Sequence, residues 1–193
     1  MKIIDRLLED KIHISFEVFP PKTDAGYEKV RSATEQIAGL HPSYISVTYG
    51  AGGGTSKNTA KIASYIRDEL GVESLAHLTC ASSTKAEVQT VIENLKALGI
   101  ENILALRGDI PEGMVFPSED RYHYAYELVE AIRRSGDFCI GAACYPEGHV
   151  ENEHKEDDDL DGLLQQQVCI ILGNNYVLTF LEKETDFFDE INA

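Results

Sequence analysis

The sequence lacks any apolar run that approaches the roughly 20 residues of a membrane-spanning helix. Its first residues, MKIIDRLLEDK, lack the basic stretch, apolar core and cleavage site of a signal peptide. Basic residues are also scarce, since 17 Lys and Arg stand against 33 Asp and Glu and leave a formal net charge of −16. Phosphate contacts require clustered Lys and Arg. We therefore expect a cytoplasmic protein that binds neither membranes nor nucleic acids.

The cysteines lack the spacing of a metal site or a redox pair. Four are present, at positions 80, 139, 144 and 169, and no two of them form a CxxC motif. Scattered thiols of this kind pack in reduced form as small hydrophobic side chains. We expect neither disulfides nor a bound metal.

Short runs rich in β-branched and aliphatic residues recur at intervals of about 30 residues, which is the length of a strand–helix unit. Amphipathic helical patterns lie between them, and Thr84 with Glu87 three residues later has the form of a capping box. Strands that alternate with helices predict an α/β protein with a parallel sheet. The predicted strands cover residues 12–19, 44–50, 74–80, 102–108, 138–145 and 175–181.

The length of 193 residues suits a single domain with about six strand–helix units. A closed barrel of eight units typically takes about 250 residues. An open doubly wound sheet would fit the length better, but its glycine signature GxGxxG is absent after the first strand.

Polar residues gather where the predicted strands end, whereas the opposite ends carry turn sequences such as LGVES and LGIEN. Parallel α/β folds bind ligands at the carboxyl ends of their strands, so this asymmetry predicts an active site there. The residues concerned are Glu17, Thr48, Tyr49, His77, Thr79, Arg107, Gly108, Asp109, Tyr145, Glu147 and His149.

Each of these features has two interpretations when taken alone. Glu17, within the apolar stretch SFEVFPPKT, either points at solvent from an edge strand or takes part in chemistry. His77 is either a core histidine or a functional one, and Asp109 either caps a turn or belongs to a site. The loop GAGGGTS at 50–56 lacks the ending of a nucleotide P-loop and is either a plain turn or a backbone surface for a ligand.

Taken together and in order, six stretches over residues 12–151 resemble the flavin-dependent 5,10-methylenetetrahydrofolate reductase family. They are SFEVFPPKT, ISVTYGAGG, AHLTC, ILALRGDIP, YHYAYELV and AACYPEGHVE. The resemblance implies a TIM-type (β/α)8 barrel that holds FAD at the carboxyl ends of its strands. It also implies that NADH or NADPH reduces the flavin, which then reduces methylenetetrahydrofolate for one-carbon metabolism and methionine biosynthesis.

The resemblance also assigns roles to individual residues. Glu17 matches the general acid that opens the methylene bridge of the folate, and Asp109 matches a carboxylate beside the flavin and the pterin. Phe16 and Phe19, with the following prolines, would shield Glu17 and help it to keep its proton. The implied FAD contacts are Thr48, His77, Arg107, Gly108, Asp109, Tyr124, Ala125, Tyr145, His149 and Asp158 or Asp159.

The resemblance weakens after about residue 152. Thr179 is followed by Phe180, where the family has a glutamine that binds folate. The preceding segment DLDGLLQQQVCIILG, which we expect to form a helix, lacks the lysine that the family tends to place there. Only about six units fit within the chain, so we expect one barrel domain over residues 1–193 that is incomplete at its C-terminus. A fragment, a natural truncation completed by oligomerisation and a degenerate copy would each explain this, and we expect a homo-oligomer with a possible partner subunit.

The leading hypothesis is therefore a flavin-dependent reductase. The alternative is a catalytically impaired flavin- or folate-binding subunit of a larger complex. A barrel aldolase or lyase is disfavoured, because no predicted strand carries a lysine at its centre for a Schiff base.

Overall fold

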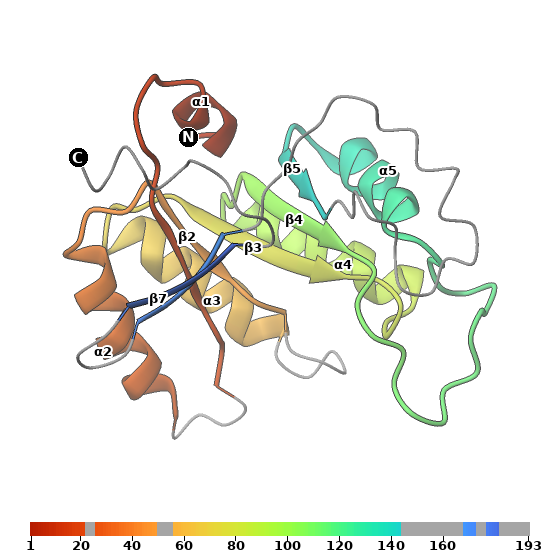
Figure 1. The fold of residues 1–193 in the computed structure, drawn as a ribbon. Helices are drawn as coiled ribbons and strands as arrows, with labels where there is room; N and C mark the ends of the chain where they lie inside the picture. Colours follow the sequence, from red (N-terminus) through yellow and green to blue (C-terminus); the bar gives the residue numbers. More distant parts are fainter. Residues whose placement is uncertain (22–25, 50–55, 144–167, 173–176, 182–193) are drawn as a thin grey trace. The chain divides into compact units, whose positions relative to one another are not determined.

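The structure is a computed structural model, which describes residues 1–21, 26–49, 56–143, 168–172 and 177–181 (Figure 1). The chain divides into two compact units, Met1–Ala143 and Cys144–Ala193, and each is described by itself. Among the described residues, no helix combines the length and apolar character needed to cross a bilayer.

The first unit is built on a five-stranded parallel sheet in which the strands follow one another in chain order. The strands are β1 (Ser15–Val18), β2 (Tyr44–Val47), β3 (Ser74–Thr79), β4 (Asn102–Leu106) and β5 (Cys139–Ala142). Each lies within one of the first five predicted strands. The α/β class is thereby confirmed, and within the described residues the sheet is open, with β1 and β5 at its edges.

Helices connect these strands as expected for strand–helix units. They are α2 (Tyr27–Ala38), α3 (Ser56–Asp68), α4 (Lys85–Ala97) and α5 (Ala125–Ser135), and a short helix α1 (Ile3–Leu7) precedes the sheet. The capping box predicted at the start of α4 is confirmed. The Glu87 amide donates to Thr84 Oγ1 at 3.2 Å, and the Thr84 amide donates to Glu87 Oε2 at 2.7 Å.

One face of the sheet is buried beneath α3, α4 and α5, which supply Ile66, Ile92 and Ile132 to the same core. The strand residues of this face are Val18, Ile45, Val47, Ala76, Leu78, Ile103 and Ala105, all buried. Because successive side chains of a strand alternate between faces, the intervening residues lie on the other face. These include Glu17, Ser46 and His77.

The amino ends of the strands are tied to the beginning of the chain through Asn102. Its side-chain oxygen accepts a hydrogen bond from the Ile3 amide at 2.8 Å, and its side-chain nitrogen donates to the carbonyls of Met1 and Ser74, each at 3.2 Å. The Met1 amine adds an ion pair with Glu101 at 2.6 Å. This polar cluster therefore holds the N-terminal segment at the end of the sheet opposite the predicted site.

The second unit contains a two-stranded antiparallel sheet, formed by β6 (Val168–Leu172) and β7 (Val177–Leu181). β7 lies within the predicted sixth strand, but it pairs antiparallel with β6. The expectation that residues 168–172 belong to a helix is wrong, since they form β6. The run VCIIL is short and rich in β-branched residues, so its apolar character fits a strand as well as a buried helix segment.

Candidate functional site

Glu17 lies on β1, on the sheet face opposite the one that packs against α3, α4 and α5, and its carboxylate contacts two neighbouring strands. Ser46 Oγ on β2 donates a hydrogen bond to Glu17 Oε2 at 3.3 Å. His77 Nε2 on β3 lies 3.4 Å from the same oxygen. The side chain of Glu17 is 45% exposed. Glu17 therefore stands on an edge strand of the described sheet, yet it is directed toward two polar groups of the sheet.

The parallel register explains how three strands supply these groups. Glu17 pairs with Ser46, and Ser46 pairs with Leu75 on β3. His77 is two residues beyond Leu75, so it keeps the same face and lies one step closer to the carboxyl end of the strand. The structure thus brings together two of the predicted site residues, Glu17 and His77. It adds Ser46, which the sequence did not indicate.

His77 is 8% exposed, and burial lowers its pKa to about 4. Its imidazole is consequently neutral near pH 7, because a charged ring would lose the hydration that water provides. The short contact with Glu17 is then one between a carboxyl group and a neutral ring, not an ion pair. His77 combines both sequence-based interpretations, since it is buried and also lies against a candidate functional group.

Phe19 does not shield Glu17 in the way the sequence suggested. Its side chain is 68% exposed, and nearly half of the Glu17 side chain is also open. Phe16 alternates with Glu17 along β1 and therefore faces the other side of the sheet. The expected aromatic walls are wrong for the described part of the chain, because strand alternation separates Phe16 from Glu17 and Phe19 lies past the end of β1.

The segment Arg107–Asp109 follows β4 and is held against the end of β3. The Arg107 carbonyl accepts hydrogen bonds from the amides of Cys80 and Ala81, at 3.1 and 2.9 Å. Gly108 has φ +77, and a Cβ placed on it would lie 2.7 Å from Thr79 Cβ. Only glycine fits both the left-handed backbone and this close approach. Asp109 is exposed at the end of this turn.

Cys80 connects this turn to the start of α5. Its Sγ lies 3.7 Å from the Arg107 carbonyl and 3.8 Å from the Tyr124 carbonyl, so its single hydrogen can be donated to either. Burial raises the pKa of Cys80 to about 11, so the group remains a thiol that can donate. Two predicted FAD-binding segments, Arg107–Gly108 and Tyr124–Ala125, are therefore linked through one buried side chain. The sequence predicted a buried thiol here, and not this connection.

Thr48 lies just after β2 and two residues beyond Ser46, so its side chain lies on the same face of the sheet. Its amide donates to the Val18 carbonyl at 3.0 Å, and its carbonyl accepts from Thr59 Oγ1 of α3 at 2.9 Å. Both bonds use the backbone, so they fix the position of Thr48 without occupying its hydroxyl. The remaining predictions lie outside the described residues, namely Tyr145, Glu147, His149, Asp158 or Asp159, and the glycine-rich loop at 50–55.

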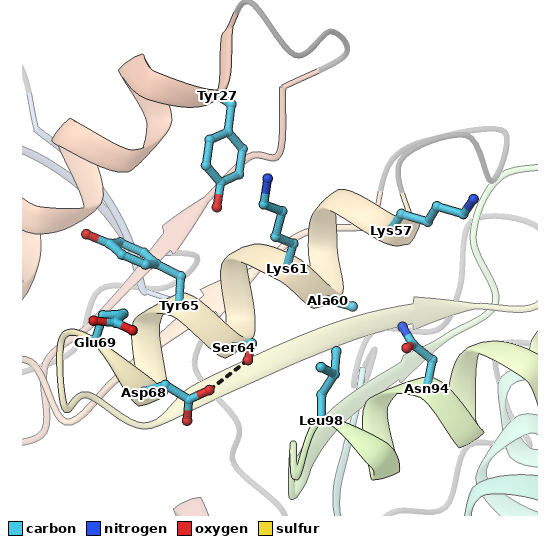
Figure 2. A pocket seen from close by; sticks show the side chains of 10 residues that line it. All are labelled: Tyr27, Lys57, Ala60, Lys61, Ser64, Tyr65, Asp68, Glu69, Asn94 and Leu98. Carbon is cyan, nitrogen blue, oxygen red and sulfur yellow. Dashed lines mark hydrogen bonds between the residues drawn. The ribbon is translucent and has the colours of Figure 1, made fainter.

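A groove of about 450 Å³ lies elsewhere, on the outer surface formed by α2, α3 and the end of α4 (Figure 2). In it, Lys61 Nζ lies 4.0 Å from the centre of the Tyr27 ring, and Ser64 Oγ donates to Asp68 Oδ2 at 2.8 Å. The lining residues are Tyr27, Lys57, Ala60, Lys61, Ser64, Tyr65, Asp68, Glu69, Asn94 and Leu98. None is a predicted site residue, so the candidate site remains the face that carries Glu17.

Comparison with known proteins gives one family. The family model for methylenetetrahydrofolate reductase matches residues 2–192. The 5,10-methylenetetrahydrofolate reductase of Escherichia coli is 36% identical over 172 residues, which cover 89% of this chain and 55% of the relative. Methylenetetrahydrofolate reductase (NADH) 1 of Zea mays is 34% identical over 204 residues, covering 97% of this chain and 34% of the relative. The chain thus spans about half, or less, of the length of these relatives.

Proposed function

The chain belongs to the methylenetetrahydrofolate reductase family, and on this premise we propose that it takes part in reducing 5,10-methylenetetrahydrofolate to 5-methyltetrahydrofolate with FAD and NADH or NADPH. The reaction belongs to cytoplasmic one-carbon metabolism. Because the chain spans 55% of the Escherichia coli relative, the activity of the whole enzyme is part of the proposal.

The observation that carries this proposal is the cluster of Glu17, Ser46 and His77 on the sheet face opposite α3, α4 and α5. A half-exposed carboxyl beside two uncharged hydrogen-bonding groups suits a proton donor better than a structural ion pair. Its position near the carboxyl ends of parallel strands is where barrel enzymes carry their catalytic groups.

The residues of this face also fit a flavin. Leu75, Leu104 and Leu106 are half-buried there, and Leu104 pairs with His77 in the strand register. A flat aromatic ring system needs such an apolar surface with polar groups at its edge, and a phosphate-bearing tail needs a cation such as Arg107. When bound, FAD would supply the hydride chemistry. We assign its binding to Thr48, His77, Arg107, Gly108, Asp109, Tyr124 and Ala125, with Tyr145, His149 and Asp158.

The chain's own residues then have distinct tasks. Glu17 delivers a proton to the folate nitrogen that leaves when the methylene bridge opens. Asp109 places negative charge at the end of β4, where it stabilises a cationic folate intermediate. Neutral His77 keeps the carboxyl of Glu17 in place without adding a positive charge beside it.

One observation favours a second function. Phe180 stands in β7 where the family resemblance expects a glutamine that binds folate. This favours a catalytically impaired flavin- or folate-binding subunit that acts within a homo-oligomer or with a partner chain. Size-exclusion chromatography with mass determination separates this assembly from a monomer of 21.4 kDa.

The experiment that tests the proposed function follows flavin absorbance under anaerobic conditions. Purified protein loaded with FAD should lose its yellow colour on addition of NADH or NADPH and regain it on addition of methylenetetrahydrofolate. Bleaching without recovery would favour the impaired subunit. A protein that does not take up FAD would contradict both functions.

A further inference from the structure

We propose that Ser46 is the positioning residue for Glu17: it holds Oε2 and leaves Oε1 as the oxygen that carries the transferable proton. This inference rests on the proposed role of Glu17 as a proton donor. Its geometric basis is the 3.3 Å hydrogen bond from Ser46 Oγ to Glu17 Oε2. The two residues are direct partners in the ladder between β1 and β2, so the pairing of the strands fixes their separation.

Ser46 is well placed to act as a fixed reference point. It is 7% exposed and lies on β2, which pairs with β1 on one side and β3 on the other. Glu17 lies on β1, which pairs only with β2 within the described sheet. A half-exposed glutamate has three rotatable side-chain bonds, so its carboxyl group samples many orientations unless a neighbour restricts it. Ser46 supplies that restriction from a strand that is paired on both sides.

Both polar contacts of the carboxyl group meet at one oxygen. Ser46 Oγ and His77 Nε2 lie 3.3 and 3.4 Å from Oε2. Ser46 donates to Oε2, which marks Oε2 as the accepting oxygen of the carboxyl group and leaves the proton on Oε1. The arrangement therefore selects which oxygen of Glu17 is the acid.

Ser46 can also release Glu17 without leaving a buried hydroxyl unsatisfied. Its Oγ lies 3.5 Å from the Phe16 carbonyl, which is a second acceptor. A hydroxyl has one hydrogen to donate, so it serves either the carboxylate or the carbonyl. In a variant that lacks the carboxyl group, such as Glu17→Ala, the hydroxyl donates to the Phe16 carbonyl instead, and the penalty for an unpaired buried donor is avoided.

The test measures the two half-reactions separately in FAD-loaded protein. Ser46→Ala should lower the rate of reoxidation by methylenetetrahydrofolate about tenfold, and leave the rate of flavin reduction by NADH or NADPH within about twofold of wild type. Ser46→Thr keeps the hydroxyl and should restore most of the rate. Ser74→Ala makes the same change at a buried serine at the amino end of β3 and should alter neither rate.

A second comparison separates positioning from general structural support. In a Glu17→Gln background, Ser46→Ala should produce no further loss in the residual folate rate, because Ser46 acts through the acid. The proposal would be overturned if Ser46→Ala slowed both half-reactions equally, or if it slowed the folate reaction further in the Glu17→Gln background. It would also be overturned if Ser46→Thr were as slow as Ser46→Ala.

Urea unfolding of Ser46→Ala, Glu17→Ala and the double variant measures the contact without any activity. The change in the free energy of unfolding of the double variant should differ from the sum of the changes in the two single variants. Additive changes would contradict a contact between Ser46 and Glu17. A wild-type protein that shows this coupling but never reduces methylenetetrahydrofolate would contradict the proposed function, and with it the catalytic purpose assigned to Ser46, while the contact stands.

Discussion

Gly108 leaves no room for a side chain beside Thr79 where β4 and β3 end, because a Cβ on Gly108 would lie only 2.7 Å from Thr79 Cβ. Replacing this glycine would force apart the turn that carries Arg107 and Asp109. Since Gly108 also has φ +77, a side chain there meets backbone strain and a steric clash together.

Gly108→Ala should destabilise the protein by about 3 kcal/mol, measured as the free energy of unfolding in urea. Gly113→Ala is a matched control, since Gly113 has the same φ of +77 but nothing within 4 Å of its Cβ position. The free energy of unfolding of Gly113→Ala should fall by only about 1 kcal/mol, which is the cost of a left-handed backbone for alanine. Equal losses in the two variants would show that the contact with Thr79 contributes nothing.

Asn102→Ala should lower the free energy of unfolding by about 2–4 kcal/mol, because it removes three hydrogen bonds and leaves the Ile3 amide and the Ser74 carbonyl without their side-chain partner. Hydrogen exchange should accelerate at the Ile3 amide. The exposed Asn94 on α4 provides the control, and Asn94→Ala should change the free energy of unfolding by less than about 0.5 kcal/mol. Unchanged stability in Asn102→Ala would contradict the role given to this cluster.

His77 predicts a pH dependence of stability. Its pKa is lowered by burial from 6.5 to about 4, so between these values the unfolded state binds more protons than the folded state. The contribution of His77 to stability is therefore complete above about pH 6.5 and is lost as the pH falls toward 4, by up to about 3 kcal/mol. Urea unfolding between pH 4 and 7 gives the free energy of unfolding at each pH, and this free energy should vary less with pH in His77→Asn than in wild type. The same pH dependence in both proteins would mean that His77 has the same pKa in the folded and unfolded states.

Cys80 should resist alkylation in the folded protein. Its thiol is buried and its pKa is raised to about 11, so little thiolate forms at pH 8. Peptide mapping after iodoacetamide treatment should recover Cys80 unmodified, and unfolding in urea should make it reactive. Rapid labelling of Cys80 in the native protein would be incompatible with its burial between Arg107 and Tyr124.

The sequence predicted the first five strands well because β-branched runs recur at a regular spacing and helix patterns lie between them. It could not predict the pairing of the later segment, where Val168–Leu172 suits a strand and a helix equally in composition. Ser46 escaped notice for a different reason. Within ISVTYG it is an ordinary strand residue, and its contact with Glu17 arises from the register between β1 and β2, which no pattern within one strand reveals.

The most direct test of the account is the Glu17→Gln variant in anaerobic stopped-flow measurements of both half-reactions. Glutamine keeps the shape of the side chain but has no acidic proton, so flavin reduction by NADH or NADPH should stay within about twofold of wild type while reoxidation by methylenetetrahydrofolate falls by about 100-fold or more. Glu93→Gln on the exposed surface of α4 should leave both rates unchanged. Equal losses in the two half-reactions of Glu17→Gln, or no loss in the second, would contradict the assignment of Glu17 as the proton donor.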